Sequence, residues 1–112
     1  MLLNGHEVDF SYVGAEDASR LSDASKAIAS RLIEVEEAQK DGWGNTVATT
    51  IDCYREYLRT ATGIDVLENC GDIETAEDAY FGFLAEVARQ KAEYMERRAE
   101  RIRHYTDLKG LI

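Results

Sequence analysis

Residues 1–10 read MLLNGHEVDF and contain the first structural signal in the chain. Asn4 and Gly5 stand between two apolar-rich segments, and this pair favours a β-hairpin because both central positions of a type I′ turn require positive φ. Val8 and Phe10 alternate with charged residues, as in a strand with one buried face. We therefore predict a β-hairpin over residues 1–13. An isolated hairpin is only marginally stable in water, so it must pack on the helices, pair with another chain, or do both.

Downstream of the hairpin, apolar residues recur every three or four positions, which is typical of amphipathic helices. This spacing predicts helices over residues 16–40, 45–61 and 74–105. Glycines around Gly42 mark the end of the first helix, the third contains only Gly82, and the chain has no proline. The expected apolar faces are, helix by helix, Ala18, Leu21, Ala24, Ile28, Leu32 and Val35; Val47, Ile51, Tyr54 and Leu58; and Phe81, Leu84, Val87 and Ala88.

The predicted fold class is mainly α, with an N-terminal β-hairpin followed by a small bundle of three principal helices, in a single domain over residues 1–112. The third helix is long for such a domain, because its roughly 30 residues span about 45 Å. Its second half carries scattered apolar residues among charges, enough to contact one other helix but too few for a full core face. We expect this half to form an arm that packs on the first helix or on another subunit.

The charge is distributed unevenly along the chain. The formal net charge is −9, which argues against general nucleic-acid binding and against docking on an anionic membrane, since both require cations that meet phosphates. Residues 89–112 contain seven Lys or Arg against four Asp or Glu, a net of +3, which leaves −12 for residues 1–88. One end could therefore attract the other, within or between subunits, although an ordinary solvated helix surface also carries such charges.

Cysteine usage and the lack of a targeting segment favour the cytoplasm. The two cysteines, Cys53 and Cys70, have no CxxC neighbour, and we expect both to serve as small buried hydrophobes. No apolar stretch approaches the length needed to cross a bilayer.

Acidic residues are plentiful, and some share a helix face. Glu34 and Glu37 are neighbours on the first helix, and paired carboxylates of this kind hold Mg²⁺ in all-α nucleotide pyrophosphatases. The usual pattern there is Glu-Glu-x-x-Glu, but Glu36-Glu37 is followed by Lys40 where the third Glu belongs. We keep a Mg²⁺-dependent pyrophosphatase as a less favoured alternative. Further acids at the start of the third helix are Glu74, Glu77 and Asp78.

Other catalytic groups are sparse. Glu100 and His104 lie one helical turn apart and could form half a metal site, but no further His or Cys has a matching spacing, and His6 belongs to the hairpin. Neither cysteine lies in a nucleophile motif, and the glycines beside Trp43 lack the lysine of a phosphate-binding loop. We predict no catalytic residue, no cofactor and no metal, and hence a protein that is not an enzyme.

The hairpin and the arm are both devices for binding partners. An exposed strand edge accepts another strand, and a long helix with some apolar surface accepts another helix. Trp43 is either an anchor for a partner or a side chain folded back over the helix ends. We expect a homo-oligomer. The candidate partner-binding residues are Val8, Phe10, Trp43, Tyr94, Met95, Ile102 and Tyr105.

The order of these features resembles that of small acidic proteins encoded among the tail genes of tailed phages and prophages, which look like tail assembly chaperones. The likeness is strongest over residues 3–20 and architectural over residues 45–105, and the arginine-rich end of the third helix departs from the family pattern. The residues that carry it are Leu3-Asn4-Gly5-His6-Glu7-Val8-Asp9-Phe10 and Ala15-Glu16-Asp17-Ala18-Ser19-Arg20.

The resemblance implies a function. Tail assembly chaperones coat the long tape-measure protein until tail-tube subunits polymerise around it. The chain is then expected to be a non-enzymatic protein of the bacterial cytoplasm, with a phage tail protein (tape-measure or tube) as client and no place in the mature virion. The acidic composition leaves a second alternative, an inhibitor that imitates DNA and occupies a DNA-binding protein.

Overall fold

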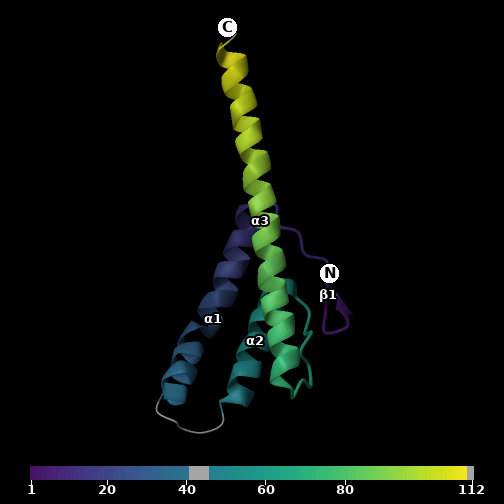
Figure 1. Ribbon diagram of the computed structural model, residues 1–112, viewed down its shortest axis with the longest axis vertical. Helices are drawn as coiled ribbons and strands as arrows, with labels where there is room; N and C mark the ends of the chain where they lie inside the picture. Colours follow the sequence, from purple (N-terminus) through teal and green to yellow (C-terminus); the bar gives the residue numbers. More distant parts are fainter. Residues whose placement is uncertain (41–45, 111–112) are drawn as a thin grey trace.

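A computed structural model of the chain describes residues 1–40 and 46–110. Two short strands, β1 (Leu2–Leu3) and β2 (His6–Glu7), precede three helices. The helices are α1 (Ala15–Lys40), α2 (Val47–Thr62) and α3 (Ile73–Gly110), and α2 lies between α1 and α3 (Figure 1). The expected fold, mainly α with a hairpin and a long last helix, is confirmed. Trp43 lies outside the described residues.

The hairpin turns where the sequence predicts. Leu2 pairs with Glu7 and Leu3 with His6 in antiparallel register. Asn4 and Gly5 have φ values of +49° and +78°, as a type I′ turn requires. The Asn4 side-chain amide also donates to the Val66 carbonyl over 2.9 Å, which ties the turn to the segment between α2 and α3.

The strands are shorter than the predicted hairpin over residues 1–13: β2 ends at Glu7, and beyond it Val8 still exchanges hydrogen bonds with Met1 over 2.8 and 3.0 Å. Residues 8–13, here called the strap, run on in extended form between the hairpin and α1 (Figure 1). Val8, Phe10 and Tyr12 are buried, and the residues between them are exposed, so the predicted alternation continues beyond the paired strands.

A side chain of α3 takes the place of that missing strand. Gln90 donates from its Nε2 to the Phe10 carbonyl over 3.0 Å, and its Oε1 accepts the Tyr12 N–H over 2.8 Å. One amide therefore satisfies two backbone groups that would otherwise need a neighbouring strand. Just beyond, Asp17 accepts the backbone N–H groups of Val13 and Gly14 over 2.7 and 3.2 Å, which fixes the start of α1.

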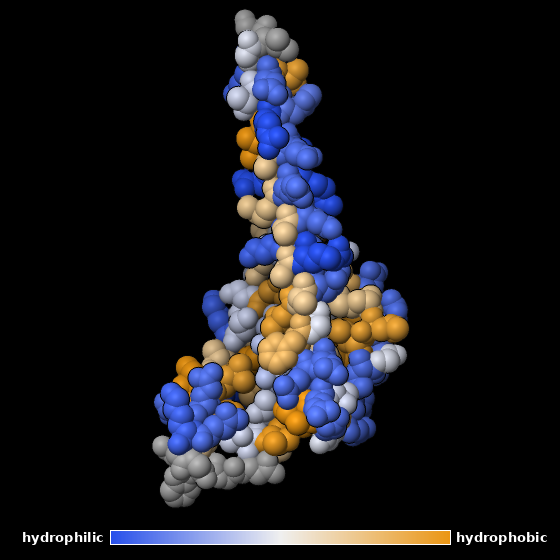
Figure 2. Space-filling view, in the orientation of Figure 1, coloured by the Kyte–Doolittle hydropathy of each residue, from blue (hydrophilic) through white to orange (hydrophobic). Residues whose placement is uncertain are grey.

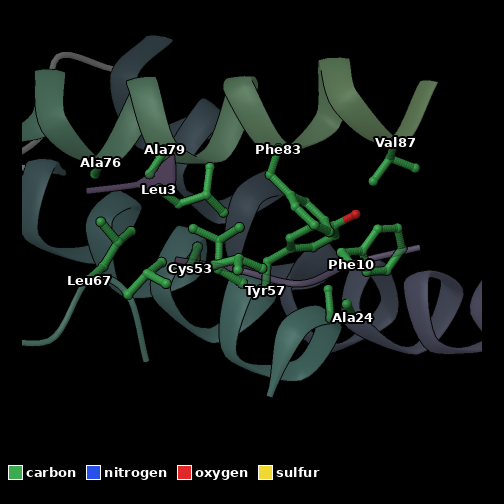
Figure 3. Close-up of a cluster of buried hydrophobic side chains, with 14 of the residues drawn as sticks. Leu3, Phe10, Ala24, Cys53, Tyr57, Leu67, Ala76, Ala79, Phe83 and Val87 are labelled. Atoms are coloured by element: carbon green, nitrogen blue, oxygen red, sulfur yellow. The ribbon is translucent and has the colours of Figure 1, made fainter. Parts of the chain in front are cut away.

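The core forms where the strap and all three helices meet (Figure 3). Phe83 of α3 is fully buried and meets the ring of Phe10 edge-on at 5.2 Å between centroids, with Tyr57 of α2 at 6.1 Å. The other buried residues of the cluster include Leu3, Val8, Ala24, Ile28, Ile51, Cys53, Leu58, Ala61, Val66, Leu67, Ala76, Ala79 and Val87.

Four residues expected on the apolar faces lie at the surface. Phe81 is 53% exposed and Val47 40%, and Ala18 and Ala88 are also exposed. The predicted face of the third helix was wrong at Phe81, because the buried row passes through Phe83. Side chains two positions apart on a helix point in directions that differ by about 200°, so Phe81 and Phe83 cannot both face the core.

Helix α3 gives the molecule its elongated shape. It continues to Gly110, beyond the predicted end at residue 105, and projects past the end of the bundle (Figure 1). The molecule measures 68 × 31 × 19 Å with a radius of gyration of 18.3 Å, against about 13 Å for a compact domain of this length. At its N-terminus, α3 is capped by Asp72, whose carboxylate accepts hydrogen bonds from the backbone N–H groups of Glu74 and Thr75 over 3.3 Å.

Candidate partner-binding surface

The last part of α3, residues 91–110, is here called the arm. Every residue in it is exposed except Tyr94, which is half-buried. Tyr94 packs edge-on against Tyr12 of the strap at 5.5 Å between ring centroids, and its hydroxyl lies 3.7 Å from where a Cβ on Gly14 would stand. The arm is therefore rooted on the strap and then leaves the body of the molecule.

One side of the arm continues the buried row of α3 into solvent. Val87, Tyr94, Arg101 and Leu108 are seven residues apart, so they lie nearly above one another on the helix. The exposed side chains on or beside this line are large: Met95 is 50% exposed, Ile102 53%, Tyr105 70% and Leu108 45%. We call this side the arm face, made of Tyr94, Met95, Arg98, Arg101, Ile102, Tyr105 and Leu108.

Charges on the arm, residues 91–110, are largely segregated, with Arg103 as the one cation that falls among the acids. At about 100° per residue, Arg98 and Arg101 fall within the arm face, and Lys91, Arg97 and Lys109 within or beside it. The acids of the arm, Glu93, Glu96, Glu100 and Asp107, lie outside the arm face, although Glu100 borders the groove that the arm face also lines. Figure 2 shows hydrophobic (orange) and hydrophilic (blue) side chains next to one another along the arm. The arm face is thus both apolar and cationic.

The cations of the arm have no acidic partners among residues 1–40 and 46–110. Arg89, just before the arm, pairs with Glu86 and, over 2.7 Å, with Glu93. No ion pair of the described residues involves Arg97, Arg98, Arg101 or Arg103. Their charge is available to an acidic partner.

A groove of about 600 Å³ opens where the arm leaves the body. Val13 of the strap, 71% exposed, forms one wall, and the arm supplies the rest. The residues that line the groove are Val13, Tyr94, Arg97, Glu100, Arg101, His104 and Tyr105. The groove therefore brings Tyr94 and Tyr105 together with two arginines and one glutamate, while Met95 and Ile102 lie farther round the helix.

The predicted partner-binding residues thus separate into two groups. Tyr94, Met95, Ile102 and Tyr105 share the arm face, as expected for an arm. Val8 and Phe10 are 1% and 7% exposed, so the structure assigns their side chains to the core and removes them from any contact surface. Burial explains this difference, because both side chains pack under α3.

Sequence reasoning missed Val13, Arg97, Arg98, Arg101 and Leu108. The seven-residue step from Tyr94 to Arg101 and Leu108 is visible in the sequence and could have identified the last two. Val13 has no such signal, because only the fold brings the end of the strap to the base of the arm.

The acidic residues and cysteines of the described ranges lie in different parts of the molecule. Glu34 and Glu37 are exposed on α1, and the described part of the chain holds no group of three or more His, Cys, Asp or Glu that could bind a metal ion. Cys53 is fully buried, and burial raises the pKa of its thiol. Cys70 is only partly buried and donates from its Sγ to the Asp72 carbonyl over 3.4 Å.

Comparisons with protein families, with curated proteins and with solved structures found no match to this chain. Over the residues that the structure describes, no helix combines the length and the apolar character that crossing a membrane requires. The functional reading consequently depends on the surface of the chain itself.

Proposed function

We propose that this chain is a protein-binding protein that holds a helix of its partner on the arm face. The observation that carries this proposal is the exposure of Met95, Ile102, Tyr105 and Leu108 on one side of a helix that nothing else in the described chain covers. Clustered exposed apolar side chains mark interaction sites. Their spacing of seven and three residues matches the way in which one helix packs on another.

The partner helix should carry apolar residues at a similar spacing, flanked by acids. Arg98 and Arg101 lie within the arm face and have no acidic partner among the described residues. Arginine forms two-pronged hydrogen bonds with carboxylates. An acidic amphipathic helix would therefore satisfy both the apolar and the charged parts of the arm face.

We further propose that the partner is a phage tail protein, the tape-measure or the tail-tube protein, and that the chain is a tail assembly chaperone. This identification is supported by the resemblance of residues 3–20 to that family and by the arm as a client-binding device. The body, with its charge of −12 over residues 1–88, would keep a bound client soluble. In this role the protein acts in the bacterial cytoplasm, catalyses no reaction and leaves before the virion matures.

Affinity capture tests the proposal. The tagged chain is expressed in its native host, the prophage is induced, and captured proteins are identified by mass spectrometry. We expect the tape-measure or tail-tube protein, and we expect a variant with Ile102→Asp and Tyr105→Asp to lose it. The matched control is Ile33→Asp, because Ile33 is 56% exposed on α1 and lies away from the arm.

Two results would contradict the proposal. One is equal capture of the tail protein by the arm variant and the control. The other is recovery of a host DNA-binding protein in place of any tail protein, which would favour an inhibitor that imitates DNA. Immunoblots of purified virions provide a second check, since a chaperone should be absent from them.

A further inference from the structure

We infer that the arm face also binds a second copy of this chain, at an acidic aromatic groove on the opposite end of the body, so that copies associate head to tail. The inference shares the arm face with the proposed function, but it needs no client. In the cell, this contact would cover the apolar arm until a client displaces it.

The second groove lies where α1 ends and where α2 and α3 begin, and it has a volume of about 340 Å³. Tyr54 and Tyr80 stack at 4.1 Å between ring centroids, and Phe81 meets them edge-on at 6.0 and 5.2 Å. Phe81 is 53% exposed, so this aromatic cluster is open to solvent. Leu32 and Val35 of α1 form the other wall.

The charge of this groove is opposite to that of the arm face. Glu36 lines it and is exposed. Glu77 of α3 is partly buried and lies one helical turn before Tyr80 and Phe81, so it places a second carboxylate beside the aromatic cluster. An apolar and acidic groove thus complements an apolar and cationic helix face. The whole chain shows the same complementarity, because the formal net charge is +3 over residues 89–112 and −12 over residues 1–88.

The arm cannot reach the groove of its own chain. Phe81 and Ile102 belong to one continuous helix, and the 21 residues between them correspond to about 32 Å. Figure 1 shows the arm leaving the bundle at the end opposite the start of α3. The two surfaces can therefore meet only between copies.

A symmetric contact between two arms is disfavoured. It would place the Arg98 and Arg101 side chains of one copy against those of the other, and like charges brought together at an interface cost several kcal/mol. A head-to-tail contact has no such repulsion. A head-to-tail pair leaves one arm and one groove unused, so further copies add to it until a ring closes or a filament grows.

Sedimentation of the purified full-length chain tests the inference, with no client present. We expect the wild type to form species beyond the 12.6 kDa monomer as concentration rises. Ile102→Asp blocks the arm and Phe81→Asp blocks the groove, so each variant alone should remain monomeric. An equimolar mixture of the two should form a heterodimer that grows no further, because each copy retains one intact surface. Ile33→Asp is the control and should assemble like the wild type.

A charge reversal provides a second pair of variants in case Phe81→Asp disturbs the aromatic cluster. Arg101→Glu and Glu36→Arg should each weaken self-association by roughly tenfold. Combining both changes in one chain should restore part of it, because the reversed charges again complement each other. Circular dichroism verifies that every variant keeps its helical content.

The inference is overturned if the wild type stays monomeric at all concentrations. It is also overturned if Phe81→Asp and Glu36→Arg assemble like the wild type while Ile102→Asp does not, which would indicate an arm-to-arm contact. These results leave the chaperone proposal intact. Conversely, a chain that assembles as described but captures no tail protein retains this inference and loses the proposed function. A monomeric Phe81→Asp that still captures the client agrees with both.

Discussion

The two halves of α3 form one continuous helix but have opposite environments. Residues 73–90 bury Ala76, Ala79, Phe83 and Val87 under the strap and α2. Residues 91–110 carry the same row forward, yet they bury nothing beyond the partly covered Tyr94. The spacing does not change between the halves. What differs is the type of residue in the row: the first half has small and aromatic residues there, whereas the second half has arginine at positions 98 and 101.

The two halves of α3 are helical for different physical reasons. The first half is helical because its apolar row packs, and tertiary packing supplies most helical stability in proteins. The second half extends a helix that is already nucleated, and it is rich in Ala, Glu, Arg and Lys, which favour helix without packing. A helix of the second kind presents its side chains to a partner instead of to its own core.

The largest expected effect comes from truncating the centre of the packed half. Phe83→Ala should reduce the free energy of unfolding by about 3–5 kcal/mol, since it leaves a cavity between Phe10 and Tyr57. The matched change on the arm, Ile102→Ala, should alter it by less than about 0.5 kcal/mol. Urea denaturation of monomeric samples measures both. Similar losses from the two variants would mean that the arm packs on the body.

The sequence was sufficient to predict the general architecture, but not the buried row of the packed half, which passes through Phe83 and leaves Phe81 exposed. Asn4 and Gly5 identified the turn, and helix boundaries followed from apolar spacing and glycines. The role of Gln90 was not predictable, because no local pattern shows that a side chain of α3 will pair with the backbone of residues 10 and 12. The same limit applies to Val8 and Phe10, whose period-2 spacing indicates one buried face but not which element covers it.

An intermediate effect is expected at Gln90, which joins the strap to α3. Gln90→Ala leaves the Phe10 carbonyl and the Tyr12 N–H without their partner, which should cost about 1–3 kcal/mol. The neighbouring Lys91→Ala changes an exposed arm residue and should have almost no effect. Hydrogen exchange at the Tyr12 amide offers a local readout. If this amide exchanges equally slowly in both variants, the strap is held by something other than Gln90.

The smallest expected effect concerns pH, at the junction between the two halves. Hydrogen bonds from Arg89 and Gln90 lower the pKa of Glu86 to about 2 from its ordinary value of 4.5. A carboxyl group whose pKa is lower in the folded state stabilises the fold above its unfolded pKa. This contribution is lost as the pH falls from about 4.5 towards 2.

Thermal unfolding between pH 2 and pH 5 measures this contribution. Glu86→Gln should lose less stability than the wild type over that range, because it has no proton to bind. Glu96→Gln, on the exposed back of the arm, is the control and should follow the wild type. Parallel curves for wild type and Glu86→Gln would show that the Glu86–Arg89 pair contributes nothing to folding.

Amide hydrogen exchange by NMR, at a concentration where the chain is monomeric, tests the contrast between the two halves most directly. Carbon chemical shifts should report helix throughout residues 73–110. The amides of residues 76–90 should exchange only through global unfolding, whereas those beyond residue 95 should exchange orders of magnitude faster, as expected of an unpacked helix. Equally slow exchange along the whole of α3 would show that the arm is packed within the monomer, and it would contradict the exposed arm face on which both proposals depend.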